Sequence, residues 1–290
     1  MARLSVRLLG PLQMTLDREP ITGFASDKVR ALLAYLAVEI EQPHRREKLA
    51  GLLWPDWPER SARANLRQAL TNLRQVIHDH QATPPFLHIS RQTIQLNSAS
   101  NAWIDVVAFT DLLQAKGLSQ QTILQLEQAV ELCRGDFLEG FSVSDSPTCE
   151  EWALLNRERL HRLVMEALYR LAEGHERRGE VEHALQHAWR QVELDPWREN
   201  AHRQLMRLLA LSGQRGAALA QYETCHRLLA DELGVEPAEE TSRLYKQIQD
   251  GKLKALVPSP ARPHEFAAKP PPFLDEEEPV EVEVPVFVAR

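Results

Sequence analysis

The chain has 290 residues and a formal net charge of −7; 43% of its residues are hydrophobic and 26% are charged, a composition that excludes a wholly disordered chain. The length suits two domains, because one domain typically has roughly 100 to 200 residues. No stretch approaches the roughly 18 consecutive apolar residues of a membrane span, and the first residues lack the apolar core and cleavage site of a signal peptide, so we expect a cytoplasmic protein with no membrane partner.

Short strands and a helix are predicted at the start of the chain. The first 22 residues alternate apolar and polar side chains around Gly10 and Pro11, which is typical of antiparallel strands. From Asp27 the apolar spacing becomes helical, with Ser26 as a candidate N-cap and Pro43 beyond the end. These signals bracket a first helix.

Two further helices follow. A short one is predicted over residues 45–54, and Pro55 stops it because proline has no N–H to donate. Asp56 and Glu59 then have the spacing of a capping box before a long amphipathic helix that ends near His78. Its apolar stripe is Leu66, Leu70, Leu73 and Ile77. The stripe expected to face outward is polar and comprises Asn65, Gln68, Thr71, Asn72 and Gln75, flanked by Arg63, Arg67 and Arg74.

A β-hairpin is predicted after the third helix. Residues 86–89 and 93–96 are apolar-rich segments separated by Ser90, Arg91 and Gln92, which places Arg91 near the tip of the hairpin. Residues 1–98 are therefore expected to form one α+β domain of strands, three helices and a hairpin.

The net charge hides an asymmetry along the chain. Residues 1–98 carry 13 basic and 9 acidic residues, a net charge of +4, whereas the remainder carries 21 and 32, a net charge of −11. Much of the positive charge lies in the second and third helices, at Arg45, Arg46, Lys48, Arg60, Arg63, Arg67 and Arg74. A polyanion is a natural partner for such a surface; the alternative is an ordinary solvated helix surface.

The second part of the chain is predicted to be a helical repeat domain over residues 103–250, because the periodic segments from Trp103 to about Gln249 are helical. Five positions recur after 34 residues: Leu171, Gly179, Ala184, Leu185 and Ala188 correspond to Leu205, Gly213, Ala218, Leu219 and Tyr222. This is the period of tetratricopeptide helix pairs, which stack because one pair cannot bury its own apolar face. We therefore expect an all-α, tetratricopeptide-like domain.

The last 40 residues have a different composition. Residues 251–290 contain 8 of the 18 prolines and the acidic run 275–278. Segments of this kind do not bury enough apolar surface to fold alone, so a Pro-rich acidic linker or tail is predicted.

No enzymatic signature is present. The sequence lacks a P-loop, a GxGxxG loop, HExxH, GxSxG and paired zinc-ligand spacings. His78 and His80 are two residues apart at a helix end and would point to different sides. Cys133, Cys149 and Cys225 lack CxxC spacing and are expected to be reduced thiols. We therefore predict a non-enzymatic protein with no catalytic residue, cofactor or metal ligand.

Several segments carry a family resemblance. Leu8–Pro11, Lys28–Leu33, Arg46–Asp56 and Ala62–Leu70 resemble the OmpR-like winged-helix domain of the antibiotic regulatory protein (SARP-type) transcription factors. One departure is Gln92-Thr93, which stands where that family often has Gly-Tyr before its last strand.

The second domain resembles the part that follows the winged helix in the same family, the bacterial transcriptional activation domain. The segments that carry this resemblance are Gly135–Phe141, Trp152, Asp195–Glu199 and Glu232–Pro237. Together the two resemblances cover about 250 residues in the family's order.

The resemblance implies that the third helix enters the major groove of DNA and that the hairpin, as the wing, reaches the neighbouring minor groove. Amide and hydroxyl side chains discriminate base edges, so the base-reading candidates are Asn65, Gln68, Thr71 and Asn72. The phosphate-binding candidates are Arg46, Arg63, Arg67 and Arg74. Arg91 is the wing candidate for a narrow minor groove.

These features predict a bacterial regulator of transcription that binds double-stranded DNA in a sequence-specific way. By resemblance it is an activator that binds direct repeats, self-associates on DNA and contacts RNA polymerase. One alternative is a repeat-based adaptor or sensor whose winged helix does not read DNA, and another is an enzyme with an unrecognised site. Because the basic surface, third helix and hairpin precede residue 98, a fragment of residues 1–98 is expected to keep DNA binding.

Overall fold

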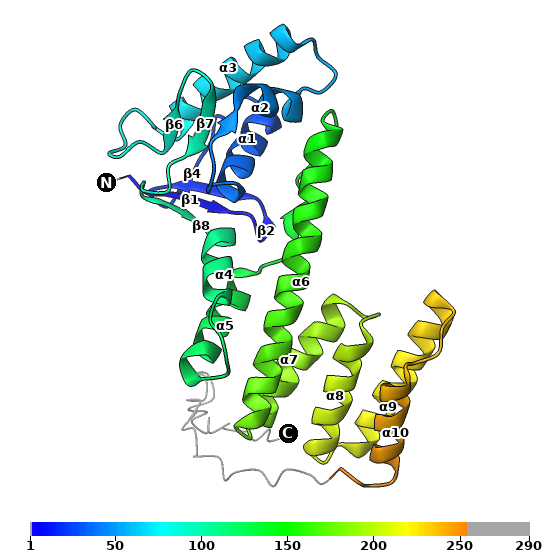
Figure 1. Cartoon of the computed structure of the whole chain (residues 1–290). Coiled ribbons are helices and arrows are strands. Elements are labelled where there is room, and N and C mark those ends of the chain that lie inside the picture. Colours follow the sequence, from blue (N-terminus) through cyan, green and yellow to red (C-terminus); the bar gives the residue numbers. More distant parts are fainter. Residues whose placement is uncertain (1, 254–290) are drawn as a thin grey trace, which may run out of the picture. The chain divides into compact units, whose positions relative to one another are not determined.

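The computed structural model describes residues 2–253 (Figure 1). The linker or tail predicted over residues 251–290 therefore lies outside the described residues except for its first three positions. The N-terminal region has the predicted order of strands, three helices and hairpin. Its elements are β1 (Leu4–Arg7), β2 (Gly10–Pro11), β3 (Gln13–Leu16), β4 (Glu19–Pro20), α1 (Asp27–Val38), β5 (His44–Arg45), α2 (Arg46–Leu53), α3 (Glu59–Val76), β6 (Leu87–Ile89) and β7 (Thr93–Leu96).

The third helix begins differently from the prediction. The N-cap of α3 is Pro58 and no side chain caps the helix, so the predicted capping box at Asp56 is wrong. The backbone N–H groups of Ser61 and Ala62 donate to the Pro58 carbonyl at 2.8 and 3.0 Å. Proline is favoured near a helix start because its φ already suits the first turn and its missing N–H costs no hydrogen bond there.

The hairpin is held against α2 by a third strand. Strands β6 and β7 pair in antiparallel fashion, with Ile89 opposite Ile94. Strand β5 pairs with the other edge of β7, with His44 opposite Ile94, giving the order β5-β7-β6. Because β5 leads directly into α2, the position of the hairpin is coupled to that helix.

Two short strands were not predicted from the sequence. Strand β8 (Ala102–Ile104) runs parallel to β1 at one edge of the sheet β4-β3-β1-β8, and β9 (Phe137–Glu139) runs parallel to β2. Both partners come from the first 11 residues of the chain. The N-terminal sheet thus continues past residue 98, and a domain boundary there stays a prediction.

The rest of the described chain is helical, and none of its helices has the length and apolar character needed to span a membrane. The helices are α4 (Asp105–Leu113), α5 (Gln120–Leu132), α6 (Pro147–Arg177), α7 (Val181–Leu194), α8 (Glu199–Leu211), α9 (Arg215–Leu228), a π-helical turn η1 (Leu229–Leu233) and α10 (Glu239–Gln249). The prediction of a mixed α/β region followed by an all-helical region is confirmed for α6 to α10.

The 34-residue period corresponds to two equivalent turns. After α6 the N–H of Glu180 donates to the His175 carbonyl at 3.0 Å, and after α8 the N–H of Gln214 donates to the Leu209 carbonyl at 2.8 Å. Between them lie Gly179 and Gly213, with φ of +74° and +81°. This left-handed backbone favours glycine, because a Cβ would be strained there.

The hydrophobic core forms two clusters. The first runs from β1 to α6 and contains Leu8, Leu53, Phe109, Phe137 and Leu168. The second lies among α6 to α10 and includes Ala184, Leu205, Ala218 and Ile248. One apolar core therefore joins the N-terminal region to the first helices of the C-terminal region.

Helix α6 links these two clusters. It has 31 residues and contacts α2 near its start and α7 near its end (Figure 1). The Nε1–H of Trp152 donates to Glu39 at 3.1 Å, and the Trp152 ring lies 5.1 Å from that of Tyr35 and 5.8 Å from that of Phe137. These contacts fix the start of α6 against α1.

Candidate nucleic-acid interface

Helix α3 presents one polar face to solvent. Its predicted buried stripe is confirmed, because Leu66, Leu70, Leu73 and the following Ile77 are at most 5% exposed. On the other side, exposed positions recur at helical spacing at Arg60, Arg67, Gln68, Thr71 and Gln75, and Glu59 is exposed at the first residue of the helix. Amide, hydroxyl and guanidinium groups thus occupy this face without a large apolar residue.

The four base-reading candidates differ in how free their side chains are. Gln68 is exposed, and its amide makes no hydrogen bond within residues 2–253. Thr71 is also exposed, and its hydroxyl donates to the Arg67 carbonyl at 2.9 Å, which leaves the oxygen able to accept. Asn65 is half-buried. Gln68 and Thr71 are therefore the most accessible of the four.

Asn72 has a structural role. Its Oδ1 accepts from the Ala25 N–H at 2.9 Å, and its Nδ2 donates to the Gly23 carbonyl at 3.1 Å. Both bonds attach α3 to the loop before α1. Base reading by Asn72 stays a prediction, and it would require this amide to exchange its present partners.

Two of the phosphate-binding candidates already have acidic partners. Arg63 lies 2.6 Å from Glu47 and 2.9 Å from Glu59, so it joins α2 to α3. The Nε of Arg74 donates at 3.1 Å to Asp79, whose side chain is 2% exposed. Asp79 in turn accepts from the Leu87 N–H at 3.0 Å. Arg74 therefore stabilises the connection between α3 and the hairpin.

Arg46 positions the wing. Its Nε and one terminal nitrogen donate to the Ser90 carbonyl at 3.2 and 2.9 Å, and its backbone N–H donates to the Gln92 carbonyl at 2.9 Å. The Ser90 hydroxyl accepts from the N–H groups of Gln92 and Thr93 at 3.1 and 2.8 Å, which closes the turn. Arg91 lies exposed in this turn.

Several arginines around α3 and the wing remain available to bind a ligand. In that region Arg45, Arg60, Arg67 and Arg91 are exposed and have no ion pair among the described residues. Arg67 and Arg91 were predicted as site residues. Arg60, Gln75 and Arg45 were not, although Arg60 lies seven residues before Arg67 and so on the same helical face. Arg45 pairs with Thr93 in the ladder beside the wing.

The cysteines offer no reactive thiol. All three are free, and burial raises the pKa of Cys133 to about 12 and those of Cys149 and Cys225 to about 11. A thiol must ionise to act as a nucleophile, so these groups remain protonated at neutral pH.

Comparison with known protein families places this geometry in context. Residues 104–249 match the model of the bacterial transcriptional activator domain. The chain belongs to this family. This match confirms the resemblance to SARP-type regulators for the helical region. Relatives that cover 83–85% of this chain extend the resemblance to the N-terminal region.

Three curated relatives of this activator-domain chain are regulators. It is 28% identical to the transcriptional regulatory protein EmbR of Mycobacterium tuberculosis over 259 residues, which cover 85% of this chain and 63% of EmbR. It is 27% identical to MoaR1 of the same species, over 83% of this chain and 78% of MoaR1. The regulatory protein AfsR of Streptomyces coelicolor is 28% identical over 83% of this chain and 24% of its own length.

A solved structure gives the same answer for the fold. The M. tuberculosis EmbR structure, a complex with a low-affinity phosphopeptide, matches with a TM-score of 0.71 at 27% identity over 88% of this chain and 67% of that one. In the sequence comparison, this chain spans about 63% of the full length of EmbR. These relatives are regulators and not enzymes, as the sequence analysis expected.

Proposed function

We propose that this chain is a cytoplasmic regulator of transcription that binds double-stranded DNA in a sequence-specific way. Helix α3 would lie in the major groove, and the β6–β7 hairpin would reach the adjacent minor groove. The observation that carries this proposal is the exposed face of α3, where Gln68 and Thr71 lie beside arginines that have no acidic partner among the described residues. Homology to EmbR, MoaR1 and AfsR supports it.

The division of labour among the side chains follows from their contacts. Gln68 and Thr71, with Asn65, carry donors and acceptors suited to base edges. Arg67 and Arg60 would neutralise phosphates on either side of the groove, while Arg91 and Arg45 would act at the wing. Arg46, Arg63 and Arg74 hold the wing and α3 in place, and a phosphate contact by any of them would add to that role.

The helical region would act on protein partners. Residues after 98 carry a net charge of −11, and an acidic surface beside a polyanion is repelled from it. We therefore propose that α4 to α10 contact RNA polymerase, or a second copy of the chain on direct repeats, and that the regulator activates transcription.

Selection of duplexes from a random library, followed by fluorescence anisotropy, tests DNA reading. The chain should enrich one sequence motif, and Gln68→Ala should lower discrimination at one base pair by about 1–3 kcal/mol. Glu223→Gln, an exposed change in α9, is the matched control and should keep full discrimination.

The adaptor alternative makes the opposite prediction. If selected and shuffled duplexes bind equally at physiological salt, the winged helix does not read DNA. Equal discrimination by wild type and Gln68→Ala, with a motif still enriched, would instead remove α3 from the reading surface.

A further inference from the structure

A cluster of histidine and glutamate side chains lies at the junction of three helices. Glu127 belongs to α5, His175 to the last turn of α6, and His183 and His187 to α7, four residues apart. Residues at that spacing lie on one face of a helix. Glu180, the N-cap of α7, lies at the edge of the cluster. The DNA-binding proposal gives these side chains no role.

His175 is the centre of the cluster. Its side chain is 5% exposed, and its two ring nitrogens face two carboxylates: Nδ1 lies 2.7 Å from Glu180 and Nε2 lies 3.2 Å from Glu127. The contact with Glu180 is a hydrogen bond. The buried Nε2 has no hydrogen-bond partner among the described residues, although the Glu127 carboxylate lies 3.2 Å away. A polar atom this deeply buried is costly without a partner.

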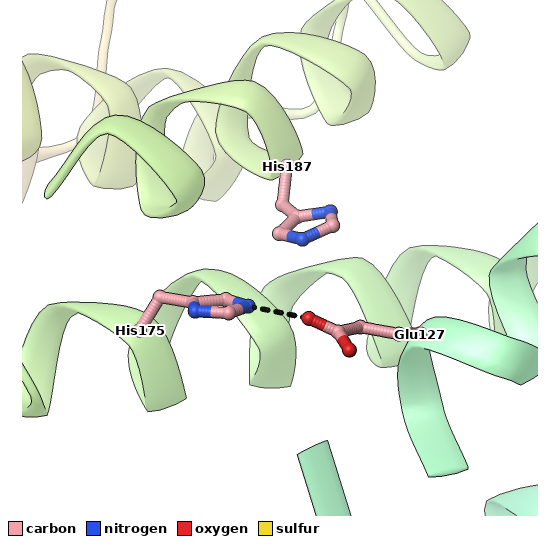
Figure 2. Close-up of side chains that lie close together, drawn as sticks. All are labelled: Glu127, His175 and His187. Atoms are coloured by element: carbon pink, nitrogen blue, oxygen red, sulfur yellow. Dashed lines mark ion pairs between the residues drawn. The ribbon is translucent and has the colours of Figure 1, made fainter. Parts of the chain in front are cut away.

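His187 completes the arrangement. It points from α7 toward the gap between the His175 ring and the Glu127 carboxylate (Figure 2). The rings of His175 and His187 are 5.3 Å apart and nearly parallel, at 19°. One ligand atom each from Glu127, His175 and His187 lies within 4.8 Å of the other two. The lone pair of an imidazole nitrogen lies in the ring plane, so the two rings would rotate out of this near-parallel arrangement to bring both nitrogens to the roughly 2.0–2.2 Å distances of zinc ligation.

We propose that Glu127, His175 and His187 bind one divalent transition-metal ion of the zinc class, with a fourth position open to water. Two imidazoles and one carboxylate are a set that zinc accepts. The Glu180 carboxylate on Nδ1 of His175 is the outer partner that orients a metal-binding imidazole and directs its Nε2 to the ion.

The electrostatics of the site suit a cation. Glu127 and Glu180 supply two carboxylates, and the guanidinium of Arg190 lies on the same helix as His187. That group is occupied by the carbonyls of Val130 and Cys133, at 3.3 and 3.1 Å.

A second triad shares His175 but fits less well. His175, Glu180 and His183 also lie within 4.8 Å of one another. Glu180 and His183 are both exposed, and the Nδ1 that this triad would need is already hydrogen-bonded to the accepting carboxylate of Glu180. The first triad uses the unsatisfied Nε2, so we assign the ion to it.

The ion would connect the two hydrophobic clusters. Ile123 and Leu126 of α5 belong to the first cluster, and Ala184 and Ala188 of α7 belong to the second. A metal bridge from α5 to α7 therefore stabilises the junction between the N-terminal core and the helical repeat. Because the ion binds the folded state, it raises the melting temperature.

The test uses the full 290-residue chain, from which metal is removed with a chelator and by dialysis. Zn²⁺ binding is then measured by competition against a chromogenic chelator. One equivalent should bind. Glu180→Gln should weaken binding by about 10- to 100-fold, the usual cost of losing an outer partner, and Glu127→Gln and His187→Asn should weaken it further. His226→Asn, which removes an exposed His–Glu pair of 2.8 Å elsewhere, should bind like wild type.

Two further measurements guard against variants that simply misfold. Co²⁺ should give ligand-field absorption bands in wild type and His183→Asn but not in His187→Asn. Zn²⁺ should raise the melting temperature of wild type and leave that of His187→Asn unchanged. The proposal is overturned if no equivalent of metal binds, if His187→Asn binds like His226→Asn, or if His183→Asn abolishes binding while His187→Asn does not.

Discussion

The carboxylate of Asp105 accepts the backbone N–H of Leu8, which lies 2.8 and 2.7 Å from its two oxygens. The same carboxylate accepts from the N–H groups of Leu9 and Val106 at 2.9 and 2.8 Å, and Asp105 is only 1% exposed. The first residue of α4 thus satisfies the backbone that follows β1. This contact joins the N-terminal region to the helical region through buried hydrogen bonds.

Asp105→Ala should lower the free energy of unfolding by about 3 kcal/mol, because it leaves backbone N–H groups buried without an acceptor. Asp111→Ala, an exposed change in the same helix, is the control and should stay within about 0.5 kcal/mol of wild type. Urea unfolding followed by circular dichroism measures both. Equal midpoints would mean that the buried carboxylate contributes nothing to stability.

A fragment of residues 1–98 should fail to unfold cooperatively. It lacks β8, Asp105, Phe109, Phe137 and Trp152, which cover the N-terminal sheet and α1, so the apolar residues of β1 would be exposed. The sequence alone predicts that this fragment binds DNA, whereas the shared core predicts that it will not do so stably.

A fragment that ends after α6, at residue 178, supplies the matched comparison. It retains every element of the first cluster and should show a sharp thermal transition by calorimetry. A cooperative transition in the 1–98 fragment, with DNA affinity equal to that of the longer one, would restore a boundary at residue 98.

The elements that the sequence predicted well are those set by local patterns. The apolar stripe of α3, the hairpin around Ser90 and the turns at Gly179 and Gly213 depend on residues close together in sequence. Strands β8 and β9 were missed because their partners, β1 and β2, lie far away along the chain. A three-residue segment carries no periodic signal of its own.

The same limit applies to the candidate sites. Helical spacing correctly placed Gln68 and Thr71 on the outside. The loop that hydrogen-bonds to Asn72 and the acidic residues that pair with Arg63 and Arg74 are tertiary contacts, and helical spacing alone does not predict them. Likewise Glu127, His175 and His187 come from three helices without a recognisable spacing, so motif searches of the sequence do not find them.

Arg67 and Arg74 should behave differently when each is replaced by alanine. The side chain of Arg67 has no ion pair among residues 2–253, so Arg67→Ala should reduce the slope of log affinity against log salt by about 0.9, the value for one phosphate contact, without changing the melting temperature. Arg74→Ala leaves Asp79 buried without its partner and should cost about 1–3 kcal/mol of stability.

Anisotropy titrations at several salt concentrations, with thermal melts of the same samples, separate the two effects. An unchanged salt slope for Arg67→Ala would remove that residue from the phosphate contacts. A normal melting temperature for Arg74→Ala would show that its pairing with Asp79 is unimportant.

The helical repeat should not tolerate a larger side chain at its close contact. Ala218 is 0% exposed in the second cluster, so Ala218→Leu should overpack it and cost about 1–3 kcal/mol. Glu223→Gln, an exposed change on the same helix α9, is the control. Urea midpoints that coincide would argue against close helix packing at Ala218.

His202 should make the helical repeat sensitive to acid. It is 0% exposed; its Nε2 lies 2.8 Å from the Pro196 carbonyl, and its Nδ1 lies 2.7 Å from the Gln221 amide nitrogen. With a proton on Nε2 alone, the ring donates to the carbonyl and accepts from the amide. A second proton on Nδ1 would face the amide N–H. Burial lowers the pKa of His202, against the opposing effects of Pro196, Glu199 and Asp195.

The sign of the effect follows from where the proton binds. The unfolded chain protonates this histidine below about pH 6.5, whereas the folded chain resists until a lower pH. Stability is therefore constant above about pH 6.5 and falls as the pH drops from there toward the lowered pKa. The side chain of His202→Gln can still donate and accept a hydrogen bond but does not titrate. Its melting temperature should therefore fall less than that of wild type when the pH is lowered from about 7.5 to about 5.5. A His202→Gln curve parallel to wild type would show that His202 is not the group that titrates.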